Sequence, residues 1–120
     1  MEERRYQFTY RFIETNTFKK KHGKMSKSVR DDLDFYLMLG RGELIKETGG
    51  LREIKIKDPS GKESWNVVFA AYYCPKIRAR IYYLLLKYPP NVLESLDQEE
   101  KNKLRMLKEK VDKYIGFNYG

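Results

Sequence analysis

The sequence has one cysteine, Cys74, and one histidine, His22. A disulfide within the chain needs two cysteines, and a zinc site needs several cysteine or histidine ligands, so the residues for either are missing. A mechanism that uses two histidines is excluded as well. Cys74 follows an aromatic run and precedes Pro75, which favours a buried or incidental thiol over a nucleophile, and His22 lies among lysines, as surface residues do. We therefore expect no metal site.

Long apolar runs and phosphate-binding glycine patterns are missing too. No apolar stretch approaches the roughly 20 residues of a membrane-spanning helix, and the first residues lack the apolar segment of a signal peptide. Gly40, Gly42, Gly49 and Gly50 fit neither the P-loop nor the dinucleotide-binding spacing, and the sequence has no serine elbow and no HExxH motif. We expect a cytoplasmic protein that uses no cofactor.

Charged and aromatic residues are abundant. With 41% hydrophobic and 14% aromatic residues, the chain is expected to form one domain, residues 1–120, with a sizeable core. The 25 Lys and Arg residues outnumber the 17 Asp and Glu residues, and the net charge of +8 favours a polyanionic partner. The excess comes from residues 1–30, with nine bases and three acids, and from residues 61–90, with five bases and one acid. A polyanion site would need these two segments to meet.

Hydrophobic periodicity in the first third of the chain predicts a strand followed by two helices. Residues 6–13 alternate, and their aromatic side is expected to face the core. A short helix is expected around Phe18. A longer helix is expected to begin at Ser26 or Ser28 and to end near Gly40.

The rest of the chain predicts three successive strands and a last helix. Residues 51–57 have an apolar and a charged side, and residues 58–61, Asp-Pro-Ser-Gly, have the composition of a tight turn. Residues 64–73 are almost wholly apolar and predict a central strand covered on both sides, and residues 78–88 predict the next strand. Residues 95–98 fit a capping box at the start of a helix. The order predicts an α+β domain: two N-terminal helices and a C-terminal one, covering one face of a mostly antiparallel sheet of about four strands.

Basic and aromatic side chains on two of these strands suit a phosphate. The residues are Arg52, Lys55, Lys57, Arg78, Arg80 and Tyr88. RNA cleavage requires that the ribose 2′-hydroxyl lose its proton, that the pentavalent phosphate be stabilised and that the leaving oxygen be protonated, and cations on a rigid sheet assist all three steps. Crowded lysines also make a neutral lysine base more accessible. The alternative is that outward-facing strand lysines protect a sheet edge from pairing with another chain.

Three stretches follow one another in an order that resembles a known family. Residues 42–56 contain Thr-Gly-Gly-Leu-Arg before a basic strand, and residues 66–69 read Asn-Val-Val-Phe. Residues 83–88 are followed by Asn91 and by residues 96–100, Leu-Asp-Gln-Glu-Glu. These stretches resemble the RelE/ParE superfamily of toxins from bacterial toxin–antitoxin modules, and the HigB-like branch most of all. The similarity covers roughly residues 5–115, and Thr-Gly-Gly-Leu-Arg is its one specific motif.

The resemblance implies a RelE-like microbial RNase fold and a type II toxin that cleaves mRNA on the ribosome and so inhibits translation. It also implies a cognate antitoxin, usually a small helix-turn-helix DNA-binding protein. By position, Lys55, Arg52 and Tyr88 are the expected catalytic residues. RNA contact is expected from Lys57, Arg78, Arg80, Lys87, Asn66 and Asn91.

Two positions depart from the family pattern. Asn66 stands where the family commonly has an arginine that grips the scissile phosphate, and Pro90 stands where it commonly has a lysine. Two rivals to the endoribonuclease therefore remain: a catalytically weakened or inactive protein that binds RNA or the ribosome, and a ParE-like toxin directed at DNA gyrase. The ribonuclease hypothesis needs cationic side chains from adjoining strands to converge on one hollow. Those expected to converge are Arg52, Lys55 and Arg80, together with Tyr88.

Overall fold

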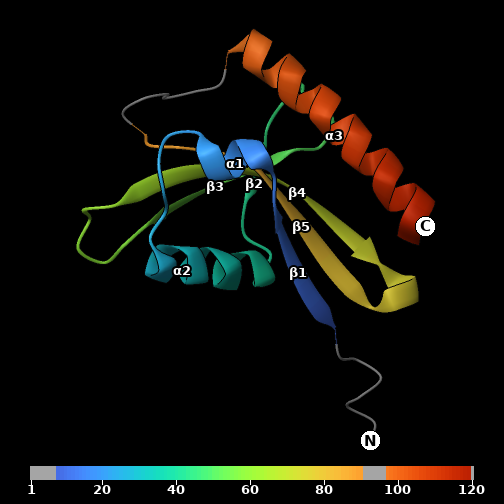
Figure 1. The fold of residues 1–120 in the computed structure, drawn as a ribbon, viewed down its shortest axis with the longest axis horizontal. Helices are drawn as coiled ribbons and strands as arrows, with labels where there is room; N and C mark the ends of the chain where they lie inside the picture. The colour runs from blue at the N-terminus through green and yellow to red at the C-terminus, as the bar shows by residue number, and fades with distance from the viewer. Residues whose placement is uncertain (1–7, 91–96, 120) are drawn as a thin grey trace, which may run out of the picture.

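The computed structural model describes residues 8–90 and 97–119 (Figure 1). Its elements in chain order are β1 (Thr9–Glu14), α1 (Asn16–Lys20), α2 (Lys27–Met38), β2 (Glu43–Leu44), β3 (Arg52–Lys57), β4 (Ser64–Cys74), the 3-10 turn η2 (Pro75–Ile77), β5 (Ala79–Tyr88) and α3 (Gln98–Tyr119). The α+β class and the C-terminal helix are as predicted, and the two N-terminal helices are matched roughly by α1 and α2, which follow β1.

The sheet differs from the prediction in two respects. It has five strands in the order β1-β5-β4-β3-β2, where about four were expected. β2 is only two residues long, too short to show an alternating pattern in the sequence. The sheet is also mixed, because β1 pairs with β5 in parallel while the other neighbours are antiparallel. A parallel pair of this kind joins the first and last strands of the chain, which local sequence patterns do not reveal.

Helices cover both faces of the sheet, so the prediction that they cover one face was wrong. Leu33 and Leu37 of α2 are buried against one face, in a cluster with Trp65 of β4. Leu104 of α3 is buried against the other face, in a cluster with Val68 of β4. Figure 1 shows α2 and α3 on opposite sides of the sheet. Residues 65–70 of β4 are buried from both sides, as predicted for that strand. The prediction was wrong for the end of the run, because Ala71 and Tyr73 are exposed.

Local signals in the sequence set the ends of several elements as expected. Ser26 caps α2 by accepting a hydrogen bond from the backbone N–H of Val29 at 3.4 Å. The turn after β3 closes through a hydrogen bond from the Gly61 N–H to the Asp58 carbonyl at 3.0 Å. At the start of α3 the cap is Asp97, whose side chain accepts from the Glu100 N–H.

The predicted start of the last helix therefore shifts from Ser95 to Asp97. The predicted capping box began at Ser95, which lies outside the described residues, whereas α3 begins directly after Asp97. Leu104, Val111 and Ile115 of α3 are buried and form the apolar side of this helix. None of the helices in the described part of the chain combines the length and the apolar character that a membrane-spanning helix needs.

A β-bulge in β5 determines which side chains reach each face near the end of that strand. Val68 pairs with Leu86 and Phe69 pairs with Leu84, so Leu85 is one extra residue opposite β4. As a result Leu85 and Leu86 both belong to the cluster on the α3 side. The alternation of β5 is inverted after this point.

Candidate functional site

Three of the predicted site residues lie in one row across three neighbouring strands. Lys55 of β3 is in register with Asn66 of β4, and Asn66 is in register with Tyr88 of β5. Residues in register on adjacent strands lie about 5 Å apart and point to the same face. Tyr88 belongs to the buried cluster on the α3 side, so the whole row, which we call the Lys55 row, lies on that face.

Glu53 is joined to this row by a hydrogen bond. The Tyr88 hydroxyl donates to Glu53 Oε2 at 2.6 Å, and Tyr88 is fully buried. Burial first, and the nearby Glu53 carboxylate second, raise the pKa of the Tyr88 hydroxyl well above its ordinary value, so it stays protonated and donates at neutral pH. Glu53 was not among the predicted site residues, although the alternation of residues 51–57 places it on the same side as Lys55 and Lys57.

The two lysines on this side of β3 are exposed to solvent. Lys55 and Lys57 are exposed, two residues apart on the same side of β3. Lys55 also borders a hollow of about 280 Å³, whose lining includes Glu53 and Gly42. The hollow lies where β2 ends, because β2 pairs only with Arg52 and Glu53 and leaves the rest of the β3 edge open. This part of the face offers two cations and two carboxylates, Glu53 and the exposed Glu43, to a ligand.

Asn66 lies between Lys55 and Tyr88, and its side-chain oxygen accepts no hydrogen bond from the described residues. It is 2% exposed, and its Oδ1 is buried with no hydrogen-bond partner within residues 8–90 and 97–119. A buried acceptor without a donor costs about 1–3 kcal/mol. Such a group in a native structure calls for an explanation, and a functional site is one.

Arg52 and Arg80 lie on the opposite face, so the predicted convergence on one hollow was wrong. Arg52 is two residues from Ile54 on β3, so the two side chains lie on the same side of the strand, and Ile54 is buried against α2. Arg80 is two residues from Tyr82 on β5 and lies on the same side of that strand. The Tyr82 hydroxyl donates to the backbone carbonyl of Leu37 in α2 at 3.0 Å. The reason is the period of a strand: Arg52 and Lys55 are three positions apart, an odd number, so they point to opposite sides.

Lys87 is also on the α2 side, and the protein itself occupies its ammonium group. Its Nζ donates to the backbone carbonyls of Phe18 and Lys21, and lies 4.9 Å from the centroid of the Phe18 ring and 5.5 Å from that of Trp65. The side chain is 2% exposed, and this burial lowers the pKa of the Lys87 ammonium group. These contacts support a structural role and argue against the predicted contact with RNA.

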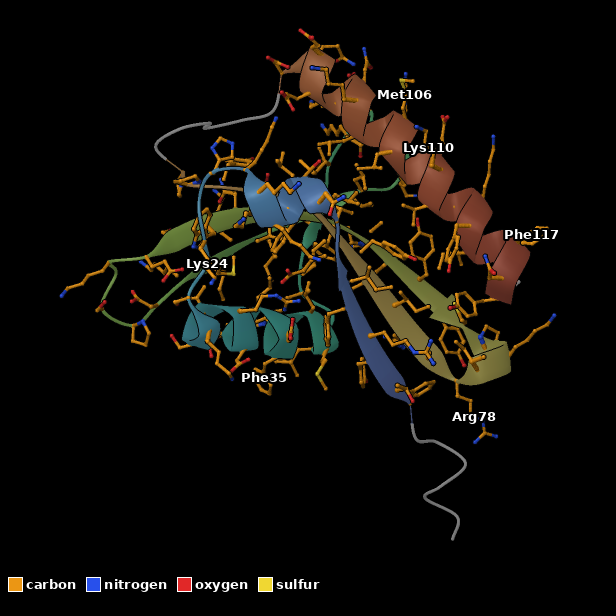
Figure 2. The ribbon with its side chains drawn as sticks, viewed as in Figure 1. Lys24, Phe35, Arg78, Met106, Lys110 and Phe117 are labelled. Atoms are coloured by element: carbon orange, nitrogen blue, oxygen red, sulfur yellow. The ribbon has the colours of Figure 1, made fainter. Side chains whose placement is uncertain are left out.

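Arg78, another predicted residue, is far from the Lys55 row. Arg78 lies between η2 and β5 at the tip of the β4–β5 hairpin, with a left-handed φ of 48°, and Figure 2 shows its side chain directed away from the sheet. The tip lies beyond Tyr73, and Asn66 and Tyr73 are seven residues apart on β4, about 23 Å at 3.3 Å per residue. Asn91 lies outside the described residues.

The expectation for Cys74 is confirmed, since the thiol is free and buried. Within the described residues, no group of three or more His, Cys, Asp and Glu side chains is placed to hold a metal ion.

Comparison of the chain with protein-family models and with curated protein sequences found no match. The candidate function therefore rests on the geometry of the site and on the resemblance of the three sequence stretches.

Proposed function

We propose that this chain is the toxin of a type II toxin–antitoxin module and that it cleaves mRNA on the ribosome at the Lys55 row. The observation that carries the proposal is the arrangement of Lys55, Asn66 and Tyr88 in register on one face, with Glu53 bonded to Tyr88. The net charge of +8 supports a polyanionic substrate. The cognate antitoxin, a small helix-turn-helix protein, and a cytoplasmic location are parts of the same proposal.

The groups present supply the three requirements of RNA cleavage. The Glu53 carboxylate takes the proton of the ribose 2′-hydroxyl, and the 2′-oxygen then attacks the adjacent phosphorus. The ammonium groups of Lys55 and Lys57 stabilise the charge on the pentavalent phosphate. Lys55 gives a proton to the 5′-oxygen as its bond to phosphorus breaks, which leaves a 2′,3′-cyclic phosphate and a 5′-hydroxyl. Tyr88 is a positioning residue, because it holds Glu53.

This assignment changes the expected catalytic set. Arg52 is on the other face of the sheet and takes no part in it. Lys57, which was expected only to bind RNA, takes the place of the missing cation at Asn66, because it lies on the same side of β3 as Lys55. Two lysine ammonium groups are point charges and lack the forked geometry of an arginine, so we expect weaker grip on the phosphate than a guanidinium gives.

A second candidate is an RNA-binding or ribosome-binding protein without cleavage. One observation favours it: Tyr88 is fully buried and Asn66 is 2% exposed, so two members of the row are covered. In that case Lys55 and Lys57 bind the RNA backbone and no bond is broken. No contact of the described residues favours the gyrase-directed alternative.

Induced expression separates the two candidates. Wild-type protein, Lys55→Ala and the control Lys110→Ala are expressed from a regulated promoter. Lys110 is an exposed residue of α3 and borders a hollow with Tyr83, not with a member of the row (Figure 2). We expect growth arrest and new 5′ ends in translated mRNA, seen by primer extension, for the wild type and Lys110→Ala. Lys55→Ala should cleave about 10²–10³-fold less.

Unchanged growth with no new 5′ ends in any of the three strains would contradict cleavage. RNA binding that weakens steeply with salt in those strains would then favour the second candidate. If purified gyrase were inhibited and mRNA remained intact, the gyrase-directed alternative would replace both.

A further inference from the structure

The face of the sheet that carries α2 is only partly covered by that helix. Burial along β4 decreases from Phe69, which is 1% exposed, to Tyr73, which is 55% exposed, with Ala71 between them also exposed. Figure 1 shows the β4–β5 hairpin extending past the end of α2. This end of the face therefore has aromatic and basic side chains, and none of the described helices packs on it.

A hollow of about 360 Å³ lies at this end, and we call it the arginine hollow. Its lining consists of Arg52, Ala71, Tyr72, Tyr73, Arg80 and Tyr82. None of these described residues is acidic, and two are arginines that come from strands on either side of β4. Charge complementarity therefore favours an anionic ligand.

Contacts within the protein hold both guanidinium groups in place. The Arg80 guanidinium carbon lies 5.6 Å from the centroid of the Phe8 ring and 5.8 Å from that of the Tyr73 ring. The two rings contact each other edge to face, with centroids 5.7 Å apart. Arg52 is held by a hydrogen bond of 3.2 Å from Nη1 to the carbonyl of Gly42. Side chains already held in one geometry lose less entropy when a ligand binds.

We propose that the arginine hollow is a second RNA-contact site, which binds a phosphate of a single strand while a neighbouring base stacks on Tyr73. Guanidinium groups are the side chains best suited to phosphate, because their fork of N–H donors matches its oxygens. An exposed aromatic ring beside a cationic groove is the usual platform for an unpaired base. The aromatic rings favour RNA over a phosphorylated peptide, which needs the arginines but not a stacking surface.

The site is separate from the Lys55 row, since the two lie on opposite faces of the sheet. This inference depends on the proposed function only in taking RNA as the ligand. Its expected effect is on affinity, because neither guanidinium reaches the face on which the 2′-hydroxyl would be attacked.

The test measures binding of a fluorescein-labelled 12-nucleotide 2′-O-methyl RNA by fluorescence anisotropy at several salt concentrations. This RNA lacks the attacking hydroxyl and stays intact, so the result does not depend on whether the chain cleaves RNA. We compare Arg52→Gln/Arg80→Gln with Lys110→Gln/Lys113→Gln, which removes the same charge from exposed positions on α3.

We expect the arginine double variant to bind at least about tenfold more weakly than the lysine control. Its slope of log affinity against log salt should be shallower by about 0.7 for each phosphate that the variant no longer binds. Tyr73→Leu should weaken binding by about 5-fold to 150-fold, the loss that follows removal of a base stack, whereas Tyr73→Phe keeps the ring and should bind as the wild type does.

Equal affinity and equal salt slopes for the arginine variant and the lysine control would overturn the proposal, given circular dichroism spectra that match the wild type. If the arginine variant does not fold, equal binding by Tyr73→Leu and Tyr73→Phe overturns it independently. Cleavage assays with Lys55→Ala remain a separate test, so failure of the hollow and failure of the proposed function are distinguishable.

Discussion

The hydroxyl of Tyr88 on β5 donates to the carboxylate of Glu53 on β3, reaching across the strand that lies between them. Tyr88 is fully buried and Glu53 is partly exposed, so the bond fixes a solvent-accessible carboxylate to the core of the sheet. A general base needs a defined position relative to the proton it removes. This pair gives the candidate site a geometrically restrained acid–base group.

The Tyr88 hydroxyl makes the fold sensitive to alkaline pH. The pKa of Tyr88 is raised in the folded state by burial and by Glu53, while in the unfolded chain it is near 10. Below pH 10 the group is protonated in both states and its stabilisation is fully present. Above pH 10 only the unfolded chain loses this proton, and stability falls by about 1.4 kcal/mol per pH unit for one group.

We therefore expect the free energy of unfolding of Tyr88→Phe to fall less steeply between pH 10 and pH 12 than that of the wild type. Urea unfolding followed by circular dichroism at each pH gives both curves. Parallel curves would show that Tyr88 ionises equally in the folded and unfolded states, contrary to its burial.

Replacing Glu53 tests its assignment as the general base. Glu53→Gln keeps an oxygen that accepts from Tyr88 but removes the charge that takes the 2′-hydroxyl proton, so cleavage should fall by about 10²–10⁴-fold. Glu43→Gln is the matched control, because Glu43 is paired in register with Glu53 and lines the same hollow. Single-turnover cleavage of a translated message measures both. Equal losses in the two variants would mean that charge near the hollow matters and that Glu53 has no special part.

Lys87→Met should separate a structural lysine from an RNA-binding one. Methionine fills the space between Phe18 and Trp65 but gives no hydrogen bond to the end of α1, so we expect a loss of about 1–3 kcal/mol in the free energy of unfolding. The salt dependence of RNA binding should be that of the wild type. A salt slope reduced by about 0.7 would instead place Lys87 on a phosphate.

Gly42 is a further point where the backbone is closely packed. A Cβ atom at Gly42 would lie 2.7 Å from Cζ of Phe69, and the residue has a φ of 127°. We expect Gly42→Ala to destabilise the fold by about 1–3 kcal/mol through this contact, in addition to the cost of the backbone conformation. Gly40→Ala is the control, since Gly40 has a φ of 80° and nothing within 4 Å of the added carbon. Urea unfolding of both variants isolates the contact with Phe69, and equal losses would show that the ring moves aside without cost.

Patterns within one element were enough to predict much of the fold. Ser26 and Gly40 predicted where α2 begins and ends, and the Asp-Pro-Ser-Gly turn predicted the connection between β3 and β4. Lys55 was found in the same way, because charged and apolar residues alternate along β3.

The errors concern relations between elements. The parallel pairing joins β1 to β5, the first and last of the described strands, and no local pattern predicts it. The placement of Arg52 was a different matter. Arg52 is two residues from Ile54, so the period of a strand already indicated that both lie on the same face. Its position in the family pattern had instead predicted that it lies beside Lys55.

The extra residue at Leu85 has a chemical consequence for the end of β5. Because it inverts the alternation, the adjacent Lys87 and Tyr88 deliver an ammonium group beneath α1 and a phenol beside Glu53. If the same residues of β5 paired regularly with β4, without the bulge, the two destinations would be exchanged: the lysine would lie beside Glu53 and α1 would lose its cationic anchor. The polarity of both faces is thus decided by a single apolar position that contributes no functional group to either.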